Sequence, residues 1–275
     1  MFNSWGVGGR MKILLAALSV TISFNGFGAT VGQLSGNPSI WANPGNFSNI
    51  FVAATVGAGH TVESAQTLTA QNIANNTHFI VESSATALAA QELSLLVDYV
   101  RGGGTLLLFA TPTTGVTSAN QILSALGPGL SGSTMNVQTQ TMGFAGSSLN
   151  WGSLSGSDPA VQGTVANLNG QSLNFTQTRL LAGGTHLALV ESPSISDAIR
   201  VDRYQLGRVY LFGTHIDANT VTGTNQFNTQ FFLNILANGG LPSGLVDSGV
   251  PEPATFGLSG VTLLGALLYL RRKRT

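Results

Sequence analysis

Cysteine is absent from the 275 residues of this chain. Without thiols the chain has no disulfide, no thiolate zinc site, no lipid-modified cysteine and no cysteine nucleophile. Charged residues are also scarce, at 8% of the chain, whereas about 25% is typical of soluble domains. Lysine is nearly missing, because Lys12 and Lys273 are the only two. Gly, Ser, Thr, Asn and Gln are therefore expected to form most of the surface.

The body of the chain has few positively charged residues. Between Thr30 and Val250 there are five arginines and ten acidic residues, so that five minus ten gives a net charge of −5. Nucleic-acid binding requires a basic surface that releases counterions from phosphates. The body is therefore not expected to bind nucleic acid.

The N-terminal segment has the pattern of a secretory signal peptide. Lys12 precedes an apolar run from Ile13 to Phe24, and small residues follow up to Ala29. The pattern predicts a signal helix within residues 1–29, recognised by the secretion machinery and by signal peptidase, and a mature chain that starts near Thr30. Cleavage after Gly28 and cleavage after Ala29 both fit the pattern. A start at Met1 or at Met11 and a buried N-terminal helix are alternatives.

The C-terminal segment has three parts in a fixed order. Val250-Pro251-Glu252-Pro253 comes first, an apolar stretch over residues 254–270 follows, and Arg271, Arg272, Lys273 and Arg274 come last. The seventeen residues of this stretch span roughly 25 Å as a helix, close to the ~30 Å of a bilayer core. Basic residues after such a helix hold that end in the cytoplasm. The order predicts a transmembrane helix over 254–270 with the body on the opposite side of the membrane from the basic residues. A helix that anchors the protein permanently is one interpretation of this pattern.

These residues, 250–275, resemble the PEP-CTERM sorting signal, a tag processed by the membrane enzyme exosortase. The resemblance implies that exosortase recognises Val250 to Pro253 and removes or exchanges the tail. It also implies a precursor that is anchored in the inner membrane and faces the periplasm. The final location would then be the cell surface or an extracellular matrix such as that of a biofilm.

The body, residues 30–240, reads as alternating strands and helices. A buried strand at 79–81, a helix at 88–101 and a buried strand at 106–109 form a crossover unit with parallel strands. The other expected elements are strands at 50–54, 187–190, 198–204 and 208–212 and a helix at 225–238. Residues 131–177 are expected to form a hairpin-rich or loop-rich insertion, and 241–249 a linker. The predicted fold class is α/β, a three-layer sandwich with a mostly parallel sheet.

Two segments, 98–109 and 207–213, resemble the class I glutamine amidotransferase-like, flavodoxin-like fold. Working members of that family carry a cysteine in a strand-to-helix elbow and a His-x-Glu pair on a later strand. Here the elbow reads Ala110-Thr111-Pro112, and His215 and Asp217 stand at the position of the pair. Because no thiol exists, the pair is predicted to be structural, and Thr111 is a nucleophile only if a base lies beside it.

Other titratable residues give weaker signals. His60 and Glu63 lack further ligands for a metal site, and His78 and His186 begin apolar strands as structural histidines do. Asp197, Asp202 and Arg203 are predicted to lie on the solvated face of a hairpin. No metal and no cofactor are expected. The sequence thus predicts a non-catalytic exported binding protein with extracellular polysaccharide as the candidate ligand, the alternative being a cysteine-independent hydrolase that uses His215 and Asp217.

Overall fold

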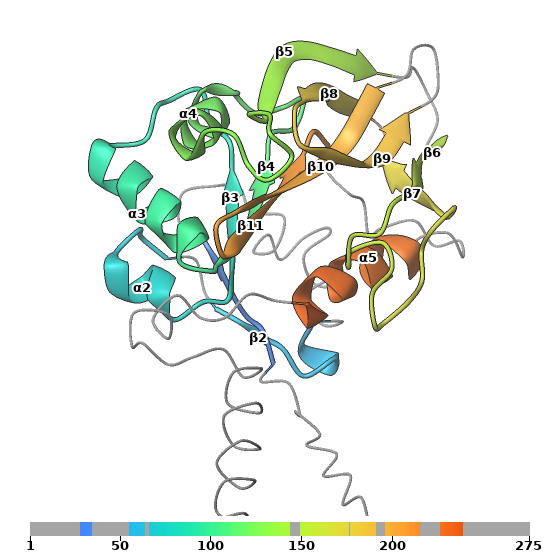
Figure 1. Cartoon of the computed structure of the whole chain (residues 1–275), viewed down its shortest axis with the longest axis horizontal. Coiled ribbons are helices and arrows are strands. Elements are labelled where there is room, and N and C mark those ends of the chain that lie inside the picture. The colour runs from blue at the N-terminus through green and yellow to red at the C-terminus, as the bar shows by residue number, and fades with distance from the viewer. Residues whose placement is uncertain are drawn as a thin grey trace, which may run out of the picture.

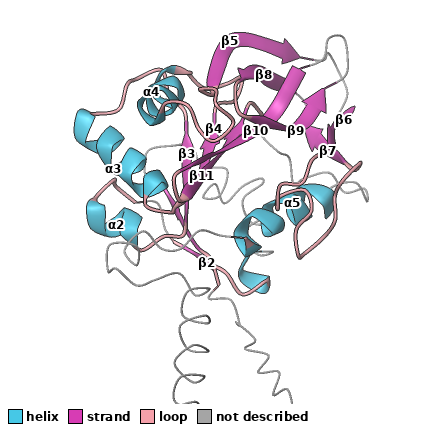
Figure 2. Ribbon diagram, in the orientation of Figure 1, coloured by secondary structure: helices cyan, strands magenta, loops and turns pink. Residues whose placement is uncertain are grey.

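The computed structural model describes residues 28–34, 55–63, 66–143, 149–175, 177–190, 196–214 and 226–238. These residues form a mixed α/β fold with helices on both sides of a large sheet (Figures 1 and 2). Its helices are α2 (Ala70–Ala74), α3 (Ala90–Arg101), α4 (Thr117–Leu126) and α5 (Gln226–Ala237). Its strands are β1 (Thr30–Gln33), β2 (Thr61–Val62), β3 (His78–Glu82), β4 (Thr105–Phe109), β5 (Asn136–Gly143), β6 (Leu149–Leu154), β7 (Ser172–Phe175), β8 (Gln177–Ala182), β9 (Thr185–Val190), β10 (Ser196–Tyr204) and β11 (Gly207–Phe212).

The main sheet is parallel in one part and antiparallel in the other. Among the described residues it has nine strands in the order β2-β1-β3-β4-β11-β10-β9-β6-β7. The strands from β2 to β11 pair in parallel, whereas β10, β9, β6 and β7 are antiparallel to their neighbours. Strands β5 and β8 form a small antiparallel sheet of their own. The sheet is therefore mixed, and its parallel part combines β1 to β4 from the N-terminal half of the chain with β11 from the C-terminal half.

Each face of the parallel part is covered by apolar side chains from helices. Strands β3, β4 and β11 are almost entirely buried, as expected of parallel strands with helices on both faces. Phe79, Leu106 and Leu108 pack with α3 and α4 on one face. On the other face Leu107, Phe109 and Phe212 pack with Phe231 and Phe232 of α5. The rings of Phe109 and Phe212 stack at 4.3 Å between centroids.

The register aligns the C-terminal ends of the central strands. Glu82 of β3 pairs with Phe109 of β4, which pairs with Phe212 of β11. The residues that follow these three strands therefore meet at one edge of the sheet, where ligand sites of open α/β sheets commonly lie.

Most elements expected in the body are present. The strands at 79–81, 106–109, 187–190, 198–204 and 208–212 and the helices at 88–101 and 225–238 are confirmed within a few residues. Residues 131–177 contain β5, β6 and β7, and β6 joins the main sheet by pairing with β9. Strand β1, α2 and α4 were not anticipated.

Several expectations fall on other parts of the chain. The strand at 50–54, the signal helix, the linker and the tail lie outside the described residues. Within the described residues, no helix has the length and apolar character needed to cross a membrane. The transmembrane helix at 254–270 thus stays a prediction.

Candidate functional site

The turn after β4 is the first candidate, because it holds Thr111. The Thr111 side chain is completely buried. Its hydroxyl lies 3.1 Å from the Thr113 hydroxyl and donates to the Thr114 hydroxyl at 3.4 Å. Pro112 and the following residues form a turn, and α4 begins only at Thr117. Thr111 thus contacts other threonine hydroxyls, which are not bases at neutral pH.

Arg179 of β8 binds the main-chain carbonyl groups of this turn. Its Nε donates to the Thr111 carbonyl oxygen at 2.8 Å, and its Nη1 donates to the Thr139 carbonyl oxygen at 2.8 Å. Its Nη2 donates to the carbonyl oxygens of Pro112 and Thr114. The side chain is buried, and burial lowers its pKa. The guanidinium therefore has a structural partner for each nitrogen and holds the turn in place.

Glu82 lies at the same edge, at the end of β3. It is 4% exposed, and burial raises the pKa of its carboxyl group to about 7. A carboxylic acid with this pKa is partly protonated near neutral pH, which is a property of general acids and bases. Glu82 is thus a titratable group at this edge, and it was not singled out in the sequence.

The predicted His215 and Asp217 pair lies outside the described residues, as do the sorting residues Val250 to Pro253 and the basic residues 271–274. The described segment that contains β11 ends at Thr214, which is buried. The parallel register of β11 with β4 directs the chain after Phe212 to the edge that holds Thr111.

Two other histidines, His60 and His78, have structural surroundings. His60 Nδ1 accepts a hydrogen bond from the Ala29 amide at 2.9 Å. Glu63 accepts from the Gln66 side chain. His78 is fully buried, its Nε2 lies 3.2 Å from the Ile235 carbonyl oxygen, and burial lowers its pKa to about 4. His186 is exposed. The described residues contain no group of three or more His, Asp or Glu side chains that would hold a metal ion.

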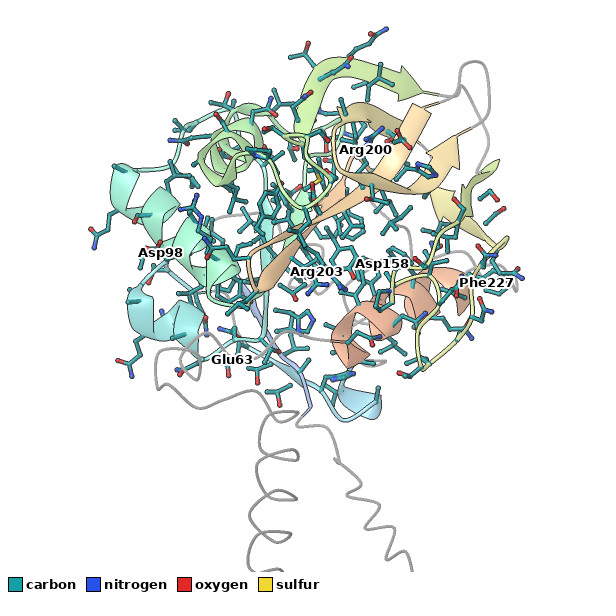
Figure 3. The ribbon with its side chains drawn as sticks, in the orientation of Figure 1. Glu63, Asp98, Asp158, Arg200, Arg203 and Phe227 are labelled. Atoms are coloured by element: carbon teal, nitrogen blue, oxygen red, sulfur yellow. The ribbon has the colours of Figure 1, made fainter. Side chains whose placement is uncertain are left out.

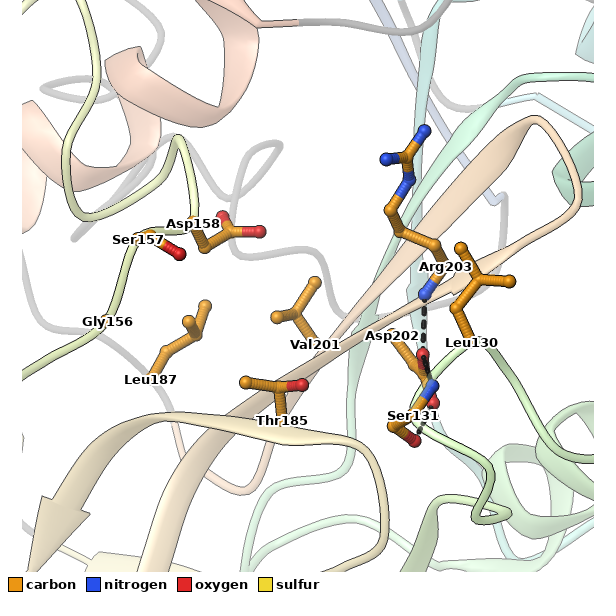
Figure 4. Close-up of a pocket in the computed structure, with 10 residues that line it drawn as sticks. All are labelled: Leu130, Ser131, Gly156, Ser157, Asp158, Thr185, Leu187, Val201, Asp202 and Arg203. Atoms are coloured by element: carbon orange, nitrogen blue, oxygen red, sulfur yellow. Dashed lines mark hydrogen bonds between the residues drawn. The ribbon is translucent and has the colours of Figure 1, made fainter.

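A pocket of about 290 Å³ lies on the antiparallel part of the sheet. Strands β9 and β10 form its floor, and the turns at 130–131 and 156–158 form its rim (Figure 4). The lining residues are Leu130, Ser131, Gly156, Ser157, Asp158, Thr185, Leu187, Val201, Asp202 and Arg203. Apolar side chains thus lie below a rim that is rich in hydroxyl and charged groups.

Asp158 is held at this rim by a partly buried chain of polar side chains. Its Oδ1 accepts from the Tyr210 hydroxyl at 2.9 Å and from the Ala160 amide at 2.9 Å. Arg208 Nη1 donates to the same tyrosine hydroxyl at 2.9 Å and lies 3.8 Å from Asp158 Oδ2. Burial raises the pKa of Tyr210, and the nearby Asp158 raises it further, so that the phenol stays protonated and donates. Asp158 is consequently held in one position at the rim by Tyr210, Ala160 and Arg208.

The position of Asp202 differs from the one predicted from the sequence. It was expected on a solvated face, but it is 4% exposed. Its carboxylate accepts from the Ser131 amide at 3.1 Å, from the Ser131 hydroxyl and from the Arg203 amide at 2.8 Å. Because neighbouring residues of a strand point to opposite faces, Asp202 binds the 129–131 turn whereas Arg203 is exposed beside the pocket. Asp197 forms an ion pair with Arg200.

Sequence reasoning missed Arg179 and Asp158. A lone arginine in a polar segment gives no sign of its partners, since all four are main-chain carbonyl groups far away in the chain. Asp158 had a weak local signal. It stands before Pro159 in a Gly-Ser-Asp-Pro turn, and aspartate commonly accepts bonds from backbone amides two residues ahead.

One family model matches the chain, the PEP-CTERM protein-sorting motif, at residues 249–274. The motif indicates an exported protein that is anchored in the membrane before exosortase processes it. No curated protein is similar enough to match the chain.

The body is similar to a number of solved structures, among them the following two. The mmIFT52 N-terminal domain has a TM-score of 0.53 and 12% identity, and the match covers 77% of this chain and 98% of that one. A β-galactosidase from Bacillus circulans sp. alkalophilus has a TM-score of 0.52 and 12% identity, covering 77% of this chain but only 31% of that one. Identities this low show the fold alone. The expected resemblance to the glutamine amidotransferase-like fold is not supported by these comparisons.

Proposed function

We propose that this exported chain delivers a non-catalytic binding domain to the cell envelope or extracellular matrix, after exosortase has processed it at Val250 to Pro253. The sorting motif at 249–274 supports export and processing. The binding role is supported by the pocket over β9 and β10, which has an apolar floor and a polar rim, the composition typical of ligand sites.

The surroundings of Thr111 carry the non-catalytic part of the proposal. A hydroxyl nucleophile needs an adjacent base and access to the substrate. Thr111 is fully buried, and the carbonyl groups of its turn bind Arg179. The Thr111 hydroxyl is therefore closed to substrate in this arrangement, and the Thr113 and Thr114 hydroxyls beside it are not bases.

A hydrolase that uses His215 and Asp217 is the second candidate. The observation in its favour is that β11 ends at the edge where Glu82, with its pKa of about 7, lies, and His215 and Asp217 follow β11 in the sequence. A histidine and a carboxyl group at one edge are the components of general acid–base catalysis.

Hydrolysis assays separate the two candidates. The purified full chain, its His215→Ala variant and its Asp217→Asn variant are tested on a panel of amides, esters and glycosides, with thermal melting in parallel. The proposal expects no turnover by any of the three. Turnover that disappears in both variants at unchanged melting temperature would establish the hydrolase instead.

Processing is tested by mass spectrometry of the envelope fraction. In a host with exosortase, peptides from residues 258–275 should be missing from the mature protein. If the intact tail is equally abundant with and without exosortase, the segment is a permanent anchor.

A further inference from the structure

We infer that the pocket over β9 and β10 binds a neutral, hydroxyl-rich ligand of the saccharide class, with Asp158 and Arg203 as its polar contacts. The inference rests on the proposed binding function and adds the site and the class of ligand. Figure 4 shows Asp158 and Arg203 on opposite sides of the pocket, with Thr185, Leu187 and Val201 between them.

The charges around the pocket favour a neutral ligand. Asp158 and Asp202 carry two negative charges, and Arg203 and Arg208 carry two positive charges. Asp202 is already bound by the 129–131 turn, and Arg208 lies beside Asp158. An anion would be attracted by Arg203 but repelled by Asp158, and a cation the reverse, so that the two effects offset each other and a ligand with a net charge gains little.

The polar groups favour hydroxyl groups as their partners. A carboxylate accepts hydrogen bonds only, and a guanidinium donates only. A hydroxyl group does both, so adjacent hydroxyl groups of one ring would match both sides of the pocket. Asp158 has one oxygen occupied by Tyr210 and Ala160, and its second oxygen has the longer contact to Arg208 at 3.8 Å.

The floor and the volume of the pocket also fit a saccharide ligand. Leu187 and Val201 form an apolar floor but are only 0% and 4% exposed, whereas Leu130 at the rim is 71% exposed, so that the C–H groups of a sugar ring would pack mainly against Leu130. The hydroxyl groups of Ser157 and Thr185 stand at the exposed rim. A volume of about 290 Å³ lies at the lower limit for small-molecule pockets, which suits a short saccharide unit.

Tyr210 acts as a positioning residue. Its hydroxyl links Asp158 to Arg208, and its ring lies under Arg208 at 5.8 Å from the centroid. The Asp158 carboxylate is thereby fixed before ligand arrives, which reduces the entropy lost on binding.

Saturation-transfer NMR on the full chain tests the inference. The protein is titrated with the methyl glycosides of glucose, galactose, mannose and N-acetylglucosamine. At least one glycoside should bind in the millimolar range. Asp158→Asn should weaken binding about tenfold because it removes the charged acceptor but leaves an oxygen for Tyr210 and Ala160. Arg203→Gln, at an exposed side chain, should weaken binding several-fold at unchanged melting temperature.

The matched control is Asp98→Asn, an exposed carboxylate on α3 (Figure 3), which should bind as the wild type does. Equal binding by wild type, Arg203→Gln and Asp98→Asn would place the ligand elsewhere and overturn this inference. Binding of a polysaccharide by the chain without binding of any glycoside would also overturn it, although the proposed binding function would survive. Hydrolysis of the glycosides would instead contradict the proposed function.

Discussion

Arg179 donates a 2.8 Å hydrogen bond from Nε to the carbonyl oxygen of Thr111, across 68 positions of the chain. The contact joins β8, in the small sheet, to the turn after β4, in the main sheet. Three more carbonyl oxygens, from Pro112, Thr114 and Thr139, accept bonds from the same guanidinium. One side chain therefore ties the small sheet to the C-terminal edge of the parallel strands.

The first prediction concerns this arginine. Arg179→Lys should lower the free energy of unfolding by about 3 kcal/mol, because an ammonium group cannot span four carbonyl groups and buried acceptors are left unpaired. Chemical denaturation measures the loss. Arg101→Lys is the control, because Arg101 makes a single exposed bond to the Ala125 carbonyl oxygen, and it should change stability by less than about 0.5 kcal/mol. Equal effects of the two substitutions would show that the carbonyl cluster adds no stability.

The second prediction concerns Glu82 and pH. Its pKa rises from 4.5 to about 7 on folding because the carboxyl group is buried. At Glu82 the folded state therefore binds more protons between these values, and the contribution of Glu82 to stability falls as pH rises from about 4.5 through about 7. Glu82→Gln should remove this fall and should stabilise the protein at alkaline pH by on the order of 1–3 kcal/mol. Unfolding free energies measured across this range check the prediction.

His78 provides the internal control for that experiment. Its pKa falls from 6.5 to about 4 on folding, so that the unfolded state binds more protons between these values. Its contribution is fully present above pH 6.5 and is lost as the pH falls toward 4. Glu82→Gln should leave this acidic decrease unchanged. If the pH profiles of wild type and variant coincide, Glu82 does not have the raised pKa.

The sequence predicted the elements that carry strong local patterns. The apolar run Leu106-Leu107-Leu108-Phe109 and the helical spacing before Gly102 identified β4 and α3, since burial on both faces requires just such residues. Strand β1 was missed because Thr30-Val31-Gly32-Gln33 is short and follows the signal-like segment, and only its pairing with β3 reveals it. Asp202 was predicted wrongly because the alternation of side chains along a strand does not reveal what covers each face of the strand. Here the turn at Ser131, 71 positions away in the chain, covers the face that carries Asp202.

The third prediction concerns Asn234, a fully buried residue of α5. Its Oδ1 accepts from the amides of Val165 and Ala166, both at 3.1 Å, and its Nδ2 donates to the carbonyl oxygens of Ala160 and Ala166. The side chain thus anchors the 160–166 loop, which follows the pocket rim, to the helix.

Asn234→Asp should destabilise the protein by about 3 kcal/mol, because a carboxylate cannot donate to the two carbonyl groups and its charge would be buried. Hydrogen exchange should become faster at the Val165 and Ala166 amides. Asn238→Asp is the control at the end of the same helix, where the side chain makes one bond to the Asn234 carbonyl oxygen. Unchanged exchange in Asn234→Asp would contradict the anchoring role.

The fourth prediction concerns the start of the mature chain, for which the sequence left cleavage after Gly28 or after Ala29 open. Ala29 is 4% exposed and belongs to the core. Its amide donates to His60 Nδ1 at 2.9 Å, and its carbonyl oxygen accepts from the Thr61 amide at 2.8 Å. Cleavage after Ala29 would remove these contacts, whereas cleavage after Gly28 would keep them.

We therefore expect signal peptidase to leave Ala29 as the first residue, and N-terminal sequencing of the exported protein should detect it. The new ammonium group would still donate to His60, whose pKa burial already lowers, so the imidazole stays neutral and accepts. His60→Ala should then lower the free energy of unfolding of the mature protein by about 1 kcal/mol, because one hydrogen bond is lost. His186→Ala, at an exposed histidine, should leave stability unchanged. A mature chain that begins at Thr30 and melts at the same temperature as one that retains Ala29 would show that the Ala29 contacts do not matter for export or folding.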